Sequence, residues 1–361
     1  MKFIKKINNM KIAFCKFAGL ANGGVEKYLQ TLAIILKKQG HEIDYYYTNA
    51  ARITTTPWIH PDNDESRIKL MIDNGINLIK INVGHRVNNE WVNTDFFDKF
   101  DEDQYECLIT GGNGESEFPY NQLKKIKIIH TVHGDHVFNQ DNIVKCVLLC
   151  KWQANRWLNN GGDSSKLEII PTVVYVPDSH TKTFREKYNI PNNAFVYGFH
   201  QRNDTTISST ISLESFSKIQ DDNTYFALLG GTSVHHNYVN NKNIKNVIFV
   251  DYTSSVNDIH DFLDGIDVYT HCRLDGEVCS ASIIEAMYHS KPIISYPGLN
   301  MGHAEQLENC GVVAYSINEY FDEMINLRNK DYYNEMSNKI KERYNSKYNY
   351  TIIEKKIISL I

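Results

Sequence analysis

The stretch from Asp275 to Met287 reads Asp-Gly-Glu-Val-Cys-Ser-Ala-Ser-Ile-Ile-Glu-Ala-Met, and the short apolar segment Pro292–Tyr296 follows it. This pattern predicts a loop, a buried helix and a strand, because apolar residues fill the turns around Glu285. Glu277 in the glycine-bearing loop and Glu285 on the helix have seven residues between them. A carboxylate on such a helix is costly to bury unless hydrogen-bond donors reach it.

The groups in this stretch have complementary chemistry. Amides at the start of the helix have no partner within the helix and form a weakly positive anion site. One carboxylate suits a diol, the amides suit a phosphate and the other carboxylate suits hydroxyls, so together they fit a sugar nucleotide. On spacing alone, an ordinary strand–loop–helix–strand unit with a solvated Glu277 explains the pattern equally well.

Length and composition indicate a soluble globular protein with room for two domains. The chain has 361 residues, of which 42% are hydrophobic and 22% are charged, and these values are typical of folded globular proteins. The net charge of −5 argues against a nucleic-acid partner, because general nucleic-acid binders usually carry a basic face.

Cysteine usage and the N-terminus favour a cytoplasmic protein. Seven cysteines are scattered without paired spacing, which suggests free thiols in a reducing compartment. Cys146 and Cys150 fall in an apolar run, so we expect them in the core. The first residues lack the apolar core of a signal peptide, and no apolar stretch approaches the roughly 20 residues that span a bilayer.

The order of predicted elements is that of an α/β protein. Residues 11–17 read as a strand, and apolar residues at helical spacing predict a helix from Val25 to about residue 38. Residues 42–47 form the next strand, and this β-loop-α-β order favours a parallel sheet flanked by helices. Further strands are predicted at 77–83, 107–110, 126–131, 146–149 and 167–171.

The pattern restarts after residues 171–191. Strands are predicted at 194–198, 225–229, 247–250, 267–270 and 292–296, with helices between them. We therefore expect two Rossmann-like, doubly wound parallel-sheet domains, residues 1–172 and 173–344, facing a central cleft. The C-terminal segment 345–361 reads as a helix that packs back on the first domain.

Three positions at predicted strand ends are candidate ligand contacts. Gly23 and Gly24 precede the first helix, where backbone amides can face a phosphate; the alternative is a tight turn. His133 follows a strand, where ligands collect in open α/β sheets. Arg202 follows the first strand of the second half and brings a permanent positive charge suited to a diphosphate; the alternative is a surface arginine.

The sequence gives little support for a metal site. Three histidines, His130, His133 and His136, recur at intervals of three, but a strand points the first two to opposite faces. The Asp-x-Asp runs at 62–64 and 101–103 lie in acidic, turn-like stretches, and we interpret them as solvated loops. We therefore predict no metal ligands.

Together these residues resemble the retaining glycosyltransferases of the GT-B fold that carry a Glu-x7-Glu motif, the family-4-like members of glycosyl transferases group 1. The resemblance spans most of the chain. The matching segments run in the family's order: Gly23–Glu26 with the following helix, His133-Gly134, Ile169–Pro171, Arg202, Leu228–Gly231, Glu277 to Glu285, and Gly302–Glu305 with Gly311.

The resemblance implies a metal-independent enzyme without a cofactor that transfers a sugar from a UDP- or GDP-sugar to a hydroxyl acceptor with retention of configuration. Gly23, Gly24 and Arg202 would hold the donor diphosphate. Glu285 would accept hydrogen bonds from the ribose hydroxyls. The groups at the transferred sugar would be His133, Glu277 and the amides of Cys279, Ser280 and Ala281.

The chain departs from the family pattern in two places. The family commonly has a lysine five residues after the arginine, where this chain has Ile207. Arg273, four residues before Glu277, is our candidate for the replacement of that cation. The usual Gly-Phe-Gly after the first glutamate is replaced by Val278–Ser280, so we expect a different fit around the donor sugar.

Two other functions compete with a transferase. A glycoside hydrolase needs two carboxylates about 5–10 Å apart across one glycosidic bond, whereas these would approach a donor from one wall. A non-catalytic GT-B-like protein that binds glycans or partners is the other alternative, and the missing lysine favours it. The acceptor, a glycan or a lipid-linked hydroxyl, is not identified by any motif, although we expect its contacts in loops at 51–64 and 111–120.

Overall fold

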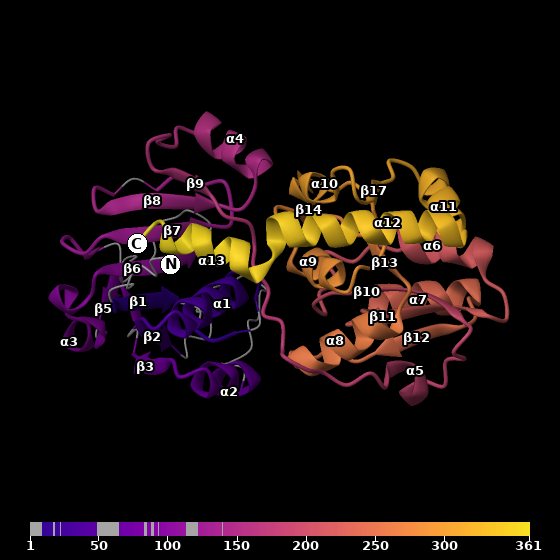
Figure 1. Ribbon diagram of the computed structural model, residues 1–361, viewed down its shortest axis with the longest axis horizontal. Helices are drawn as coiled ribbons and strands as arrows, with labels where there is room; N and C mark the ends of the chain where they lie inside the picture. Colours follow the sequence, from indigo (N-terminus) through magenta and orange to yellow (C-terminus); the bar gives the residue numbers. More distant parts are fainter. Residues whose placement is uncertain are drawn as a thin grey trace, which may run out of the picture. The chain divides into compact units, whose positions relative to one another are not determined.

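The computed structural model describes residues 9–16, 19–21, 23–48, 65–82, 85–87, 90–92, 94–112, 122–138 and 140–361 (Figure 1). The chain separates into two compact units. One contains residues 1–149, 153–170 and 353–361, and the other contains residues 150–152 and 171–352. The main division between residues 170 and 171 lies two residues before the boundary that the sequence suggested.

A parallel seven-stranded sheet is the centre of the first unit. Its order is β3-β2-β1-β6-β7-β8-β9, and each neighbouring pair is parallel. The chain runs outward from β1 to β3 and then continues from β6 on the other side of β1. The switch point, where open α/β sheets bind ligands, therefore lies between β1 and β6. The strand bounds are β1 Lys11–Lys16, β2 Glu42–Thr48, β3 Asn77–Ile81, β6 Cys107–Gly112, β7 Ile128–Val132, β8 Ile143–Leu148 and β9 Leu167–Ile169.

Helix α1 (Gly24–Lys38) connects the first two strands and packs against this sheet. Its apolar side chains, including Leu29 and Leu32, are fully buried. The helix ends where Gly40 takes a φ of +93°, a left-handed conformation that glycine adopts at little cost. The other elements that begin in this part of the chain are α2 Glu65–Asp73, the hairpin of β4 His85–Val87 and β5 Glu90–Val92, α3 Phe96–Lys99, η1 Glu102–Gln104 and α4 Lys151–Asn159.

The second unit is built on a parallel six-stranded sheet. Its order is β12-β11-β10-β13-β15-β17, all pairs are parallel, and the switch point lies between β10 and β13. The strands are β10 Phe195–His200, β11 Thr224–Leu229, β12 Val247–Val250, β13 Val268–His271, β15 Ile293–Ser295 and β17 Val312–Val313, with a small separate pair of β14 Gly276–Glu277 and β16 Asn300–Met301. The helices are α5 Phe184–Lys187, α6 Ile211–Ile219, α7 Ser233–Lys242, α8 Val256–Gly265, α9 Ala281–Tyr288, α10 Gly302–Leu307, α11 Ile317–Asn326 and α12 Lys330–Arg343.

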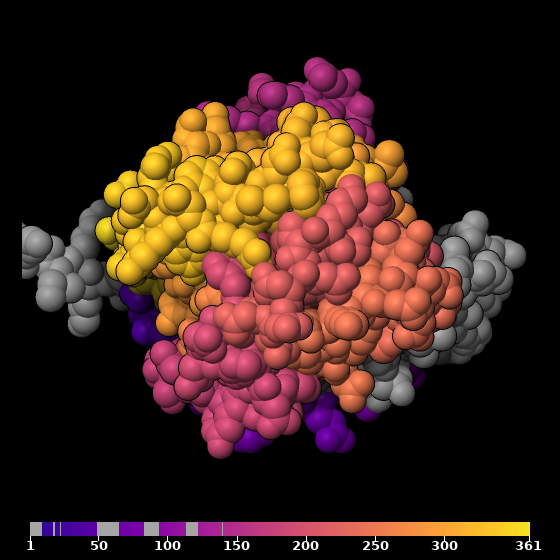
Figure 2. Space-filling view, turned by 90° about the vertical axis from the view of Figure 1, so that its right-hand side faces the viewer, coloured from indigo at the N-terminus to yellow at the C-terminus, as the bar shows by residue number. Residues whose placement is uncertain are grey.

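The C-terminal segment is not one continuous helix. After α12, residues Tyr344–Tyr348 form a π-helical turn, and α13 (Tyr350–Ile358) follows. Ile353 and Ile357 of α13 are fully buried, and residues 353–361 belong to the first unit. Within the second unit, α11 packs on α6, and the yellow surface of the C-terminal helices borders the salmon surface around α6 in Figure 2.

The predicted fold class, an α/β protein with two doubly wound parallel sheets, is confirmed. The predicted strand at 126–131 is shifted, because β7 begins at Ile128. The pairs β4–β5 and β14–β16 were not predicted, since strands of two or three residues are too short to show a period. Asp101–Asp103 lies at the surface as interpreted, where the Asp101 side chain caps η1. The Asp-x-Asp run at 62–64 and the expected acceptor loop at 51–64 both lie outside the described part of the chain.

All seven cysteines lie within the described residues. Cys146 and Cys150 are buried in the core as expected, and all seven cysteines are free thiols. None of the helices in the described ranges is both long enough and apolar enough to cross a bilayer.

His130 makes the first unit sensitive to acid. Its ring is buried in β7, with Nδ1 2.8 Å from the Thr110 hydroxyl. Burial, with a smaller contribution from Lys16, lowers the pKa of His130 to about 4. The neutral ring therefore favours the folded state above the unfolded-state pKa of about 6.5, and this contribution is lost as the pH falls from about 6.5 towards 4.

We predict that His130→Gln reduces the acid sensitivity of unfolding. Between pH 7 and pH 5 the wild type should lose about 2 kcal/mol more of its unfolding free energy than the variant. Urea denaturation at the two pH values measures the difference. His136→Gln, which changes an exposed histidine in the same unit, is the control and should keep the wild-type pH dependence. An equal loss in wild type and His130→Gln would contradict this account.

Candidate functional site

Two arginines follow the two strands that flank the switch point of the second sheet. β10 ends at His200 and β13 ends at His271, and Arg202 and Arg273 come two residues after these ends. The carboxyl ends of parallel strands meet at one edge of a sheet, and ligands bind there at the switch point. The fold thus places two permanent positive charges at the edge where a bound anion is expected.

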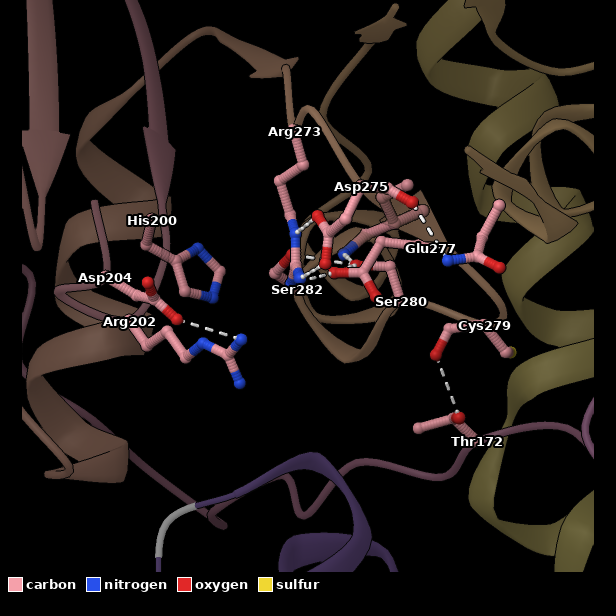
Figure 3. A network of polar contacts seen from close by, with 12 residues as sticks. Thr172, His200, Arg202, Asp204, Arg273, Asp275, Glu277, Cys279, Ser280 and Ser282 are labelled. Atoms are coloured by element: carbon pink, nitrogen blue, oxygen red, sulfur yellow. Dashed lines mark hydrogen bonds and ion pairs between the residues drawn. The ribbon is translucent and has the colours of Figure 1, made fainter. Parts of the chain in front are cut away.

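Arg273 is held by two carboxylates of its own loop. Its Nε and Nη2 donate to the two oxygens of Asp275 at 2.9 and 2.6 Å, and its Nη1 donates to Glu277 at 2.6 Å (Figure 3). The Asp275 contact is a two-point pairing of guanidinium with carboxylate, which fixes direction as well as distance. This network orients Glu277, whose Oε1 also lies 3.4 Å from the Ser280 hydroxyl.

Burial and neighbouring charges shift the pKa values of Glu277 and Arg273. Burial raises the pKa of Glu277, and the neighbouring positive charge of Arg273 only partly opposes that effect. Burial alone would lower the pKa of Arg273, but Glu277 and Asp275 raise it above its ordinary value. Arg273 is therefore a permanent cation whose charge is largely balanced within the loop.

The loop between β13 and α9 depends on a glycine. Gly276 has a φ of +64°, and a Cβ at this position would lie 2.1 Å from the Asn300 carbonyl oxygen. The close approach lets β14 pair with β16, and the Asn300 side-chain amide donates to the Asp275 carbonyl at 2.9 Å. Only glycine fits this turn, so the position of Glu277 relies on it.

Helix α9 starts directly behind this loop. Ser280 is its N-cap and accepts from the Ile283 amide, a role for which serine is well suited. The Ser280 amide itself donates to Gln306 at 2.7 Å, and Gln306 returns a bond to the Ser280 carbonyl at 3.1 Å. The Cys279 carbonyl accepts from the Thr172 hydroxyl at 3.0 Å (Figure 3). The Ser280 amide is thus engaged by a side chain of the same unit.

Glu285 lies on the buried side of α9 and pairs with His200. Glu285 Oε2 is 2.7 Å from His200 Nε2, and each side chain is 8% exposed. The donor that a carboxylate needs in such a place is therefore present. Because His200 ends β10, this contact links α9 to the sheet edge that carries Arg202.

Arg202 is the more accessible of the two arginines. Its guanidinium lies 3.0 Å from Asp204, and 44% of its side chain is exposed (Figure 3). Its positive charge also acts on Glu277 and partly opposes the rise in pKa that burial causes there. The structure thus brings Arg202, Arg273, Glu277, Ser280 and Ala281 into one region of the second unit.

Position 207, where the family that the sequence resembles commonly has a lysine, has its backbone next to that of Arg273. The Leu274 amide donates to the Ile207 carbonyl at 3.2 Å, and Ser208 and Arg273 form an isolated antiparallel bridge. Ile207 itself is buried, with 1% exposure. The backbone that carries Arg273 therefore runs beside residues 207 and 208, while its guanidinium is directed at Asp275 and Glu277.

The remaining candidates lie in the first unit. Gly23 is the N-cap of α1, and no atom within 4 Å would meet a Cβ added at Gly24, so the helix start has open space beside it. The His133 amide donates to the Gly112 carbonyl of β6 at 2.7 Å, which places His133 next to the switch point. Burial lowers the pKa of His133 to about 3, so its ring is neutral at neutral pH.

The sequence did not point to several groups that complete the site. His200, Asp275 and Gln306 each hold a predicted residue by a direct hydrogen bond. A signal existed for His200, since it is a polar residue at the end of an apolar strand. Asp275 lay inside the quoted motif but was not weighed, and nothing local in the sequence connects Gln306 with Ser280.

Comparison with known proteins supports this location. Residues 180–343, which lie in the second unit, match the family model described as Glycosyl transferases group 1. A search of curated protein sequences found no match to the chain.

Solved structures share the fold along nearly the whole chain. The crystal structure of Anabaena Alr3699/HepE in complex with UDP and glucose has a TM-score of 0.75 at 13% identity and covers 98% of this chain and 99% of its own. The glycosyltransferase from Rickettsia africae ESF-5 has a TM-score of 0.73 at 16% identity, with 98% coverage of both chains. WaaG, a glycosyltransferase involved in lipopolysaccharide biosynthesis, has a TM-score of 0.66 at 14% identity and covers 97% and 99%. The predicted GT-B fold is thereby confirmed.

We predict that Arg273→Ala destabilises the second unit by leaving two acids without a counter-charge. The unfolding free energy should fall by about 2 kcal/mol at pH 7, less than for a fully buried pair because the network is partly solvated. Without Arg273 the pKa of Glu277 rises further, so folding takes up a proton as the pH falls, and the deficit relative to wild type should shrink at pH 5.

Denaturation at both pH values tests this prediction. Adding Glu277→Gln to Arg273→Ala should recover part of the lost stability, as in a double-mutant cycle. Lys339→Ala, which removes an exposed pair with Glu335, is the control and should change stability little. A deficit in Arg273→Ala that is the same at both pH values would argue against an unbalanced carboxylate.

Proposed function

We propose that this protein is a retaining glycosyltransferase that binds a nucleoside-diphosphate sugar through its second unit and transfers the sugar to a hydroxyl acceptor. The carrying observation is the arrangement of Arg202, Arg273 and Glu277 at the switch point, directly before α9 with its Glu285. The group 1 domain at residues 180–343 and the shared fold support the proposal. The donor class is inferred from this chemistry and from the similar Anabaena protein, which was crystallised with UDP and glucose.

In this proposal the donor is held at three points. Arg202 binds the diphosphate, with Arg273 behind it as the second cation and the amides at Gly23 and Gly24 as further donors. Glu285, oriented by His200, accepts hydrogen bonds from the ribose hydroxyls. A third group of residues contacts the transferred sugar: His133, Glu277, Cys279, Ser280 and Ala281.

Contact of the Ser280 amide with the sugar requires a rearrangement. This amide is bonded to Gln306 at 2.7 Å, so Gln306 must turn aside before the amide can donate to a ligand. The amides of Cys279 and Ala281 are proposed for the same role. Gln306 would then act as the partner that keeps the N-terminus of α9 satisfied before the donor binds.

The transfer step is proposed to occur on one face of the sugar. The bond between the anomeric carbon and the β-phosphate oxygen breaks, the acceptor oxygen bonds to that carbon from the same side, and the acceptor proton passes to an oxygen of the departing diphosphate. The protein positions the reactants and stabilises charge. Arg202 and Arg273 offset the negative charge that grows on the leaving group, and no residue must serve as a covalent nucleophile.

Nucleotide binding tests the donor site. In titration calorimetry with UDP, GDP and ADP, we expect one of them to bind, and Glu285→Ala should weaken it by about tenfold to hundredfold, the loss expected for hydrogen bonds to a charged group. Arg202→Ala should weaken the diphosphate but leave binding of the matching nucleoside unchanged.

Glu335→Gln is the control for this titration. It alters an exposed carboxylate that pairs with Lys339 on α12 and should bind the nucleotide like wild type. If none of the three nucleoside diphosphates produces heat, or if Glu285→Ala binds as tightly as Glu335→Gln, the donor site is assigned to the wrong residues.

A binding protein without transferase activity is the second candidate. It is favoured by Ile207 in place of the lysine and by the pairing of Arg273 with the carboxylates of its own loop, which reduces the positive charge available to a leaving group.

Activity with the matching nucleotide sugar distinguishes the two candidates. For the transferase we expect slow hydrolysis or transfer, with Glu277→Ala lowering the rate at least tenfold. Proton NMR of the newly formed bond should show the donor's anomeric configuration; nucleotide-sugar binding with no turnover would select the binding protein.

A further inference from the structure

Three histidines and an aspartate form a cluster in the second unit that plays no part in the proposed donor site. His180 precedes α5, Asp264 is near the end of α8, and His289 is the C-cap of α9. One ligand atom from each lies within 4.8 Å of the others. His260 of α8 adds a third ring, and the three ring centres are 5.0 to 5.5 Å apart.

The Asp264 carboxylate faces both outer histidines. Its Oδ1 lies 2.9 Å from His289 Nδ1, and its Oδ2 contacts His180 Nε2. All three side chains are mostly buried, with 24% of Asp264, 11% of His180 and 4% of His289 exposed. Two imidazole nitrogens with one carboxylate oxygen is a set of protein ligands that zinc uses together with one further ligand such as water.

His260 supplies the outer contact that metal-bound histidines usually have. Its Nδ1 is 2.7 Å from His289 Nε2, and the ring also makes a hydrogen bond with the Tyr175 backbone. A ligating histidine almost always donates its second ring N–H to such a partner, which fixes its tautomer. His289 thus has one nitrogen directed at Asp264 and the other held by His260.

These contacts restrict the protons that neutral rings can carry. If His260 donates its Nε2–H to the Tyr175 backbone, its Nδ1 must accept from His289 Nε2–H. His289 Nδ1 then presents a lone pair to the carboxylate oxygen 2.9 Å away. Two lone pairs at that distance repel each other, so either the His289 ring is protonated and donates to Asp264, or a cation lies between the two atoms.

We propose that His180, Asp264 and His289 bind one divalent zinc ion, with water as its fourth ligand. In a tetrahedral zinc site, ligand atoms about 2.0–2.2 Å from the metal lie about 3.3–3.5 Å from each other. The three ligand atoms lie within 4.8 Å of one another, so side-chain movements would bring them to this geometry. Such a site would differ from the prediction from the sequence that the chain has no metal ligands. The sequence gives no sign of it, because its members are far apart along the chain and share no motif spacing.

Two lysines near the cluster bear on its charge. Lys182 Nζ is 3.5 Å from Asp264 Oδ2, but 73% of its side chain is exposed, so it can turn into solvent when a cation binds. Lys291 donates to the backbone carbonyl of Asp264 at 3.3 Å rather than to its carboxylate.

A zinc ion at this position would link α8, α9 and the segment that contains His180, and α9 carries residues of the proposed donor site. His289 follows Glu285 by four residues on the helix that carries it, and α8 packs against α9. His180 belongs to the segment through which the chain enters the second sheet. A bound ion would therefore fix α9 from its C-terminal end, while Ser280 and Gln306 hold its N-terminal end.

Zinc binding to the full chain tests the proposal without nucleotide or activity. Protein freed of metal with a chelator and then desalted is titrated with Zn²⁺ alone, and metal retained after gel filtration is measured by mass spectrometry. Wild type should keep one zinc per chain, melt at a higher temperature with zinc, and show nitrogen and oxygen ligands at about 2.0–2.1 Å in X-ray absorption. His180→Gln and Asp264→Asn should each weaken zinc binding at least tenfold.

His236→Gln is the matched control, since it changes an exposed histidine of the same unit that stacks on Phe249. It should bind zinc like wild type. Circular dichroism identifies a variant that fails to fold, and His180→Gln, which alters a residue outside helices and strands, then decides the matter. Wild type that retains no zinc would overturn the proposal and leave a protonated hydrogen-bonded cluster; zinc bound equally by His180→Gln and His236→Gln would also overturn it.

Discussion

The Arg273 guanidinium joins two acids that lie two and four residues further along the chain, and the rest of the candidate site depends on this contact. Repulsion between Asp275 and Glu277 would otherwise open the loop after β13. With the arginine between them, the loop closes over Gly276, pairs with β16 and delivers Ser280 to the start of α9. A salt-bridge network that is only partly buried adds modest stability, so its main effect is on geometry.

The charges around Arg273 and Arg202 also indicate which arginine an anion would contact. The charge of Arg273 is balanced by two carboxylates, whereas Arg202 pairs with Asp204 and is more exposed. A diphosphate approaching this sheet edge would therefore first meet Arg202. Glu285 lies on the buried side of α9, and its bond to His200 connects that helix with the end of β10.

Much of the fold could be predicted from the sequence because buried parallel strands appear in it as continuous apolar runs. Runs such as Phe226–Leu229 and Val247–Val250 are apolar throughout, which is expected of strands covered on both faces. The glycine loop before α1, and the Glu277 to Glu285 stretch, stand where β-α connections must turn. Arginines two residues beyond strand ends could be placed at the sheet edge for the same reason.

The rest depends on tertiary contacts that leave no local signal. Gln306 holds the Ser280 amide across 26 residues, and His200 reaches Glu285 across 85. The cluster of His180, Asp264 and His289 joins three segments that no spacing rule connects. The π-helical turn after α12 also escaped prediction, since its sequence continues the helical pattern without an evident break.

A crystal structure with a bound nucleoside diphosphate is the most direct test of the account. The account predicts phosphate oxygens within hydrogen-bond distance of the Arg202 guanidinium, and ribose hydroxyls on the Glu285 carboxylate while His200 still holds its other side. A nucleotide bound elsewhere, or a Glu285 that contacts only His200 in the complex, would contradict it.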